Sequence, residues 1–111
     1  MAVHEIERYG IYFADLDPVR GSEIAKTRPV VVVSQDAMNR HLETVVVCPL
    51  TSVLHPMWRS RVLCKCARRK AEIAVDQIRT LSKRRLIRRL DRLTPVVARQ
   101  VRQLITEMYG E

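Results

Sequence analysis

Three short polar segments of the chain combine cations, hydroxyls, a carboxylate and an amide, and each lies beside an apolar run. The first precedes four consecutive valines, the second follows Val-Val-Val-Cys-Pro-Leu, and the third follows Ala-Glu-Ile-Ala-Val. An arginine offers a planar pair of donors to two phosphate oxygens, and a threonine hydroxyl can donate a further hydrogen bond. A phosphate diester therefore suits these side chains, which are Lys26, Thr27, Arg28, Thr51, Ser52, Asp76, Gln77, Arg79 and Thr80.

The apolar runs beside these segments predict buried β-strands, because valine runs without alternation are typical of strands covered on both faces. Pro29 suits the first residue of a strand, since it has no N–H, and Pro49 indicates an edge or a bulge. The predicted strands are residues 9–16, 29–34, 44–52, 59–67 and 71–78, with residues 68–70 as the turn between the last two. A closed sheet would bring the polar rims of these strands into one cleft.

Helical patterns are found in two further places. Residues 34–42 predict a short helix capped by Ser34 or Asp36. Thr94 and Pro95 form an N-cap followed by a residue suited to the first helical position, and apolar residues then recur at helical spacing up to Gly110.

Residues 82–93 form a basic run in which leucines and Ile87 recur at helix-like spacing, so a short amphipathic helix with basic outer positions is predicted there. Short strands together with one terminal amphipathic helix favour a mainly β, α+β fold. We expect a small β-barrel or half-open sheet with the helix packed on it, in one domain spanning residues 1–111.

The net charge of +8 indicates an anionic partner, and it is unevenly distributed. Residues 59–102 hold 15 basic and three acidic side chains, a net +12, whereas the rest of the chain carries −4. An odd number of cysteines without a Cys-x-x-Cys pair fits a reducing cytosol. We see no signal peptide and no apolar run of membrane-spanning length, so a cytoplasmic protein without a membrane partner is expected.

The stretches "GSEIAKTRPVVVVS", "VVVCPLTS" and "VDQIRTLSKRRL" resemble the MazF/PemK family of toxin endoribonucleases from bacterial toxin–antitoxin systems. The resemblance covers roughly residues 9–90. It implies an SH3-like barrel, a homodimer, and metal-independent, sequence-specific cleavage of single-stranded RNA, whether mRNA or another cellular RNA. It also implies a cognate antitoxin like MazE, whose disordered acidic tail covers the RNA groove.

The same resemblance assigns roles to individual residues. Arg28 and Thr51 take the positions of the catalytic pair. Glu23 and Lys26 lie on the first loop, which flanks the groove in the family. The other positions implied to contact RNA or support the site are Thr27, Ser52, Asp76, Gln77, Arg79 and Thr80.

Two features depart from the branch of the family that includes the toxin Kid. Ala74 stands where that branch has an arginine, and no histidine lies between Asp17 and Thr27. The resemblance therefore implies the mechanism based on Arg28 and Thr51, in which the RNA 2′-hydroxyl attacks the adjacent phosphorus. Asp76 is a candidate base for that hydroxyl or, equally, a structural turn residue.

Four more side chains are predicted as possible groove contacts: His55, Trp58, Arg59 and Arg61. Trp58 can stack on a base or fill the core. Cys64 and Cys66 share one strand face, but together with His55 they lack further ligands at zinc-site spacing, so no metal and no cofactor is expected.

Two alternatives remain open at this point. A protein-binding toxin of the same fold, such as the gyrase poison CcdB, acts through a C-terminal Trp-Gly-Ile, whereas this chain ends in Met-Tyr-Gly-Glu. A non-catalytic RNA-binding module would retain RNA in a salt-dependent manner without cutting it.

Overall fold

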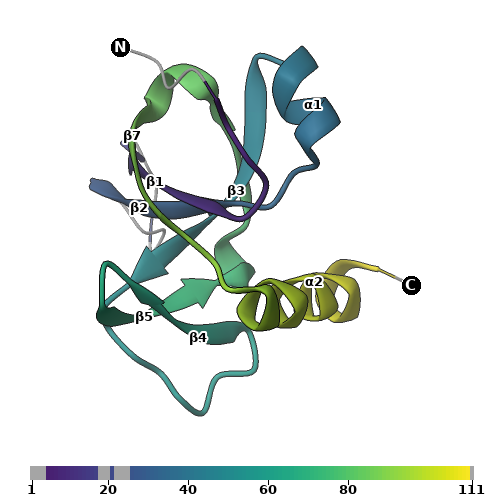
Figure 1. Ribbon diagram of the computed structural model, residues 1–111. Helices are drawn as coiled ribbons and strands as arrows, with labels where there is room; N and C mark the ends of the chain where they lie inside the picture. The colour runs from purple at the N-terminus through teal and green to yellow at the C-terminus, as the bar shows by residue number, and fades with distance from the viewer. Residues whose placement is uncertain (1–4, 18–20, 22–25, 111) are drawn as a thin grey trace.

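The computed structural model of the chain describes residues 5–17, 21 and 26–110, which form a curled antiparallel sheet and a C-terminal helix (Figure 1). The strands are β1 (Gly10–Asp15), β2 (Thr27–Val32), β3 (Thr44–Thr51), β4 (Arg61–Cys66), β5 (Arg69–Ala74), β6 (Arg79–Ser82) and β7 (Leu86–Arg92). The helices are α1 (Asp36–His41) and α2 (Pro95–Tyr109), with 3₁₀ turns η1 (Val75–Gln77) and η2 (Lys83–Arg85). The predicted α+β class, with a half-closed barrel and a terminal helix, is confirmed.

Strand β3 organises the sheet, because it takes part in both of its halves. The strand order is β4-β5-β3-β2-β1-β7, and β6 also pairs with β3. The first half of β3 pairs with β6, from Thr44 to Val47, and its last two residues pair with β5. Pro49 lies just before β3 changes partner, which is the irregularity that this proline predicts.

Alternate residues of the central strands bury two separate apolar clusters, one on each face of the sheet. The barrel core contains Tyr12, Ala14, Leu16, Val30, Val32, Val45, Val47, Leu81 and Leu86. The helix core lies on the other face and includes Ile11, Val31, Cys48, Leu50, Ile73, Ala98 and Val101. The valine run of β2 therefore supplies both cores, as a strand covered on both faces must.

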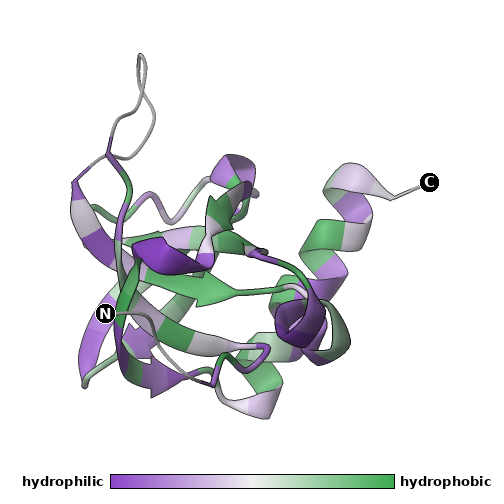
Figure 2. Cartoon of the chain, turned by 90° about the horizontal axis from the view of Figure 1, so that it is seen from above, coloured by the Kyte–Doolittle hydropathy of each residue, from purple (hydrophilic) through white to green (hydrophobic). Residues whose placement is uncertain are grey.

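Helix α2 begins and ends as predicted. The Thr94 hydroxyl accepts from the Val97 N–H at 3.3 Å, Pro95 occupies the first helical position, and Gly110 is the C-cap residue. Hydrophobic and hydrophilic stretches alternate along the helix in Figure 2. Its buried residues, Ala98 and Val101, join the helix core. Among the described residues, no helix is long and apolar enough to cross a bilayer.

The short helix α1 is present, but the predicted side-chain cap is wrong. Its N-cap residue is Gln35, which makes no side-chain capping bond. The Ser34 hydroxyl instead donates to Asn39 Oδ1 at 2.5 Å, and Asp36 Oδ1 accepts from the Arg8 N–H at 2.7 Å. Ser34 thus bonds to a residue inside α1 and Asp36 to a residue far along the chain, and neither side chain caps the helix terminus.

The amphipathic helix predicted for residues 82–93 is wrong, because this segment forms the end of β6, the turn η2 and the strand β7. Two irregularities in the pairing with β1 explain the error. Tyr12 pairs with Arg89 and Ile11 with Asp91, so Leu90 is an extra residue, and Ile87 is a second one. The bulges let Leu86 enter the barrel core while Leu90 and Leu93 join the helix core, so the spacing of four and three residues imitates a helix although the leucines lie on two faces.

Strand bounds differ from the prediction at two of the polar segments. Strand β2 begins at Thr27, so Arg28 lies within the strand, paired with Ala14, and not in the preceding loop. Strand β5 ends at Ala74, and the Asp-Gln pair lies on the 3₁₀ turn η1. The β4–β5 turn is formed by Ala67 and Arg68, one residue before the predicted turn.

The β4–β5 turn is strained, because Ala67 (φ 51°) and Arg68 (φ 70°) both adopt the left-handed conformation. Two-residue hairpin turns of this kind favour Asn-Gly. The Asp91 carboxylate stabilises this turn by accepting a hydrogen bond from the Ala67 N–H at 2.9 Å. This bond and a second one from the Arg92 N–H lower the pKa of Asp91.

Replacing this turn with Asn-Gly is expected to stabilise the protein. The double variant Ala67→Asn/Arg68→Gly should raise the free energy of unfolding by about 1 kcal/mol, which corresponds to roughly 4 °C in Tm. The matched control is Arg69→Gly in strand β5, which should lower stability by about 0.5–1 kcal/mol. Thermal unfolding of the variants measures both effects. If the double variant and Arg69→Gly were equally destabilised, the β4–β5 turn would not be strained at Ala67 and Arg68.

All three cysteines are buried thiols. Burial raises the pKa of Cys48 and Cys64 to about 12 and also raises that of Cys66. A thiol with a raised pKa in the folded state keeps a proton that the unfolded chain releases. This contribution to stability is complete below the unfolded pKa of about 8.5 and is lost as the pH rises toward 12.

We therefore expect Tm to fall as the pH is raised above about 8.5, and the fall should be smaller in Cys48→Ala.

At neutral pH a thiol reagent such as Ellman's should react slowly with the folded protein and at once with all three cysteines in denaturant. Rapid reaction of the folded protein would show that these thiols are accessible.

Candidate functional site

Several of the predicted site residues surround one depression of about 370 Å³ at the end of β3. Its walls come from β3, from the 52–60 segment, from the start of β4 and from η1. The lining residues are Thr51, Val53, His55, Trp58, Arg61, Asp76 and Gln77. The structure thus brings together six of the residues that the sequence predicts for the site, from two separate stretches of the chain, 51–61 and 76–77.

Arg28 does not line this depression but lies one strand away from Thr51, on the same face of the sheet. The paired residues of β2 and β3 run from Val32↔Val47 to Val30↔Pro49, and the alternation of side chains along each strand puts Arg28 on the face of Val30 and Thr51 on the face of Pro49. Directly opposed residues of antiparallel strands point to the same side. Arg28 and Thr51 therefore lie on the barrel-core face of two adjacent strands, each two residues beyond the last paired residues, Val30 and Pro49.

Pro29 explains why the ladder between β2 and β3 stops before this point. The Leu16 N–H donates to the Lys26 carbonyl, so the even-numbered residues of β2 bond to β1 and the odd-numbered ones face β3. Pro29 faces β3 and has no N–H to donate. Strand β1 continues to hold Arg28 through Ala14, so the arginine lies half-buried on a paired strand.

Thr51 is buried, with 7% of its surface exposed, and its hydroxyl oxygen accepts from the Val53 N–H at 3.1 Å. This bond uses a lone pair of the oxygen and leaves the hydroxyl proton for another acceptor. Ser52 beside it is exposed. The threonine is thus positioned to donate to a bound anion.

Arg61, a predicted groove contact, lines the depression and is also held by two carboxylates. Its Nε donates to Asp76 Oδ1 at 2.9 Å, and its NH1 lies 3.7 Å from Glu72 Oε1. Its guanidinium also lies over the Trp58 ring, 4.6 Å from the centroid. The Arg61 side chain is only 6% exposed, so its charge is already balanced within the protein.

Sequence reasoning missed Glu72, which is 3% exposed. Both of its carboxylate oxygens accept from the His55 N–H, at 2.9 and 3.0 Å. A carboxylate inside an otherwise apolar strand is almost never buried without partners. The glutamate in Ala-Glu-Ile-Ala-Val was therefore the signal that a paired charge lies at this position.

Lys26 and Arg79 flank the first loop. Lys26 adopts a left-handed backbone conformation (φ 68°), and its N–H donates to Asp17 Oδ1 at 2.9 Å. Arg79 NH1 donates to the Leu16 carbonyl at 3.4 Å. Thr27 and Thr80 are exposed. Glu23, predicted on the same loop, lies outside the described residues.

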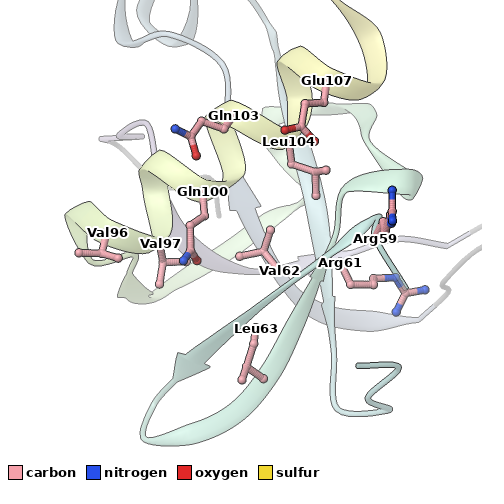
Figure 3. A pocket seen from close by; sticks show the side chains of 10 residues that line it. All are labelled: Arg59, Arg61, Val62, Leu63, Val96, Val97, Gln100, Gln103, Leu104 and Glu107. Atoms are coloured by element: carbon pink, nitrogen blue, oxygen red, sulfur yellow. The ribbon is translucent and has the colours of Figure 1, made fainter. Parts of the chain in front are cut away.

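Arg59 lies in a different groove, between α2 and β4. Figure 3 shows Arg59 and Arg61 at one end of this groove, where Leu104 of α2 lies near them, and Val96 at the other end. Arg59 is exposed and does not line the depression at Thr51. Within residues 5–17, 21 and 26–110, no three His, Cys, Asp or Glu side chains gather as metal ligands would.

Comparison with known proteins gives a consistent result. Residues 7–109 match the family described as PemK-like, MazF-like toxin of type II toxin–antitoxin system. The chain is 33% identical over 110 residues to the Endoribonuclease MazF of Staphylococcus saprophyticus, a match that covers 95% of this chain and 92% of the relative.

Solved structures share the fold. MazF from Deinococcus radiodurans superimposes with a TM-score of 0.85 at 22% identity, covering 98% of this chain and 100% of the other. A mycobacterial endoribonuclease in complex with its cognate antitoxin gives a TM-score of 0.78 at 24% identity, covering 97% of this chain and 96% of the other.

Proposed function

Because the chain belongs to the PemK-like, MazF-like toxins of type II toxin–antitoxin systems, we propose that it is an endoribonuclease that cleaves single-stranded RNA. The observation that supports this proposal best is that Arg28 and Thr51 lie on one face of adjacent strands, and that Thr51 lines a depression with polar walls. A guanidinium and a hydroxyl on one face suit a phosphate diester.

In the proposed reaction the RNA 2′-oxygen attacks the adjacent phosphorus in line, and the bond to the 5′-oxygen of the next nucleotide breaks. The 2′-hydroxyl loses its proton and the leaving 5′-oxygen gains one. The products are a 2′,3′-cyclic phosphate, or the 3′-phosphate after its hydrolysis, and a 5′-hydroxyl. Negative charge accumulates on the non-bridging oxygens, where Arg28 would stabilise it, while the Thr51 hydroxyl would donate to one of them.

The charge of the chain supports binding of a polyanion. Residues 59–102 carry a net +12 in the sequence, and the exposed residues of β7 include Arg88, Arg89 and Arg92. Such charges add affinity by displacing the counterions of RNA. The stacked rings of His55 and Trp58, at the rim of the depression, offer the outer face of His55 as a stacking surface for a base.

The proposal includes two protein partners. The mycobacterial relative was solved with its cognate antitoxin and the Deinococcus relative as a MazE–MazF complex, so a cognate acidic antitoxin is proposed for this chain. A homodimer is also proposed. Light scattering of the pure protein at several concentrations tests the dimer, and a monomer at all of them would contradict it.

The test of the reaction is incubation of the pure protein with a long mixed-sequence single-stranded RNA in excess EDTA. Cleavage at a short recurring sequence with new 5′-hydroxyl ends is expected. Intact RNA would contradict the proposal. Salt-dependent retention of RNA without new ends would instead identify a non-catalytic RNA-binding module.

A further inference from the structure

Glu72 is a buried carboxylate outside the proposed catalytic pair. It lies on β5 between Ala71 and Ile73, which are buried apolar residues. Burying a carboxylate is costly unless it is hydrogen-bonded and its charge is compensated. Glu72 meets both conditions, through the His55 N–H and the guanidinium of Arg61.

The position of Glu72 relates it to the proposed site. It pairs directly with Thr51 across β3 and β5, so the two side chains point to the same face of the sheet. The chain leaves β3 at Thr51, and four residues later the His55 N–H returns to the carboxylate of Glu72. The segment that forms one wall of the depression is therefore fastened to β5 at this point.

The contacts of Glu72 belong to a closed circuit of four residues. The Trp58 N–H donates to the His55 carbonyl at 2.9 Å across a turn that contains Pro56, and the two rings stack with centroids 3.8 Å apart and planes inclined by 6°. Arg61 lies over the Trp58 ring and returns to Glu72 at 3.7 Å. Each member thus limits the movement of the next.

We propose that Glu72 is a positioning residue that holds the stacked His55 and Trp58 rings in place, so that the outer face of the His55 ring is the platform for an RNA base beside Thr51. The inference rests on the proposed function. In this role Glu72 does not contact RNA itself. A platform held in place before binding costs no ordering when the base arrives. Loss of Glu72 should therefore weaken RNA binding more than it slows the chemical step.

The variants to compare are Glu72→Val and Glu72→Gln. Valine suits a strand but removes the acceptor for the His55 N–H, whereas glutamine keeps one oxygen acceptor. Arg61 retains Asp76 in both variants. Glu43→Val is the matched control, because Glu43 is an exposed glutamate just before β3.

The first readout needs no RNA, because Trp58 is the single tryptophan of the chain. In Glu72→Val the tryptophan emission should shift to the red and acrylamide should quench it more strongly, while Glu72→Gln and Glu43→Val should resemble the wild type. Unchanged emission and quenching in a folded Glu72→Val would overturn the inference.

The second readout is the kinetics of RNA cleavage. Because stacking of one base contributes to binding, KM should rise about tenfold in Glu72→Val with kcat changed much less. A fall in kcat at constant KM would overturn the positioning role. Should the wild type not cleave RNA, the proposed function fails, and the fluorescence comparison still decides whether Glu72 positions the two rings.

A measurement on the wild type covers the case in which Glu72→Val does not fold. The His55 amide should exchange with deuterium more slowly than that of Leu54, because its hydrogen is bound by the buried carboxylate. Equal and rapid exchange of the two amides would overturn the inference.

Discussion

Arg28→Ala is expected to lower kcat for RNA cleavage by about 10²–10³-fold, the usual cost of removing one donor to a charged transition state. The fold should persist, because Arg28 lies half-buried at the end of the barrel-core face and its main chain remains paired with Ala14. Cleavage kinetics together with thermal unfolding measure the two effects separately.

The chemistry at position 28 can be tested with a conservative change. Arg28→Lys keeps the charge but loses the planar pair of donors, so activity should fall between those of the wild type and Arg28→Ala. Arg40→Ala on the exposed side of α1 is the control for removing one positive charge. Wild-type kcat in a folded Arg28→Ala would remove this residue from the mechanism.

A double-mutant cycle tests whether Arg28 and Thr51 act on one phosphate. If both contact the same diester, Arg28→Ala/Thr51→Val should lose less than the product of the two single losses, because the second change removes an interaction that the first has already impaired. Strictly multiplicative losses would indicate that the two side chains act at separate places.

The sequence predicted those parts of the fold in which local signals agree with tertiary structure. The valine runs gave β2 and β3, and Thr94 with Pro95 gave the start of α2, because burial on both faces and helix capping leave direct traces in composition. Strand β7 could not be predicted in this way. Its bulges at Ile87 and Leu90 are set by the pairing with β1, which no local pattern records.

The candidate site likewise has some features that the local sequence predicts and others that depend on tertiary contacts. The types and order of the polar residues predicted that Thr51, Asp76 and Gln77 would meet, and they line one depression. Which cation remains available to a ligand depends on partners far along the chain. Arg61 has the same local appearance as Arg59, yet two carboxylates from β5 and η1 bind only Arg61.

This difference between two neighbouring arginines leads to the second large effect. Arg61→Leu should lower the free energy of unfolding by about 3 kcal/mol, because it leaves Glu72 buried without a counter-charge. The value is taken at the lower end of the usual range, since the Asp76 side chain is 30% exposed and can turn to water. Tm should fall by roughly 10 °C.

Arg59→Leu is the matched control, because it makes the same change two residues earlier at an exposed position, where the effect should stay within about 0.5 kcal/mol. Adding Glu72→Val to Arg61→Leu should recover part of the lost stability, since an apolar replacement of a whole buried pair is far less costly than a single uncompensated charge. The double-mutant cycle consists of the wild type, Arg61→Leu, Glu72→Val and the double variant, and thermal and denaturant unfolding measure the stability of each. Equal losses in Arg59→Leu and Arg61→Leu would mean that the Glu72 carboxylate is compensated by the His55 N–H alone.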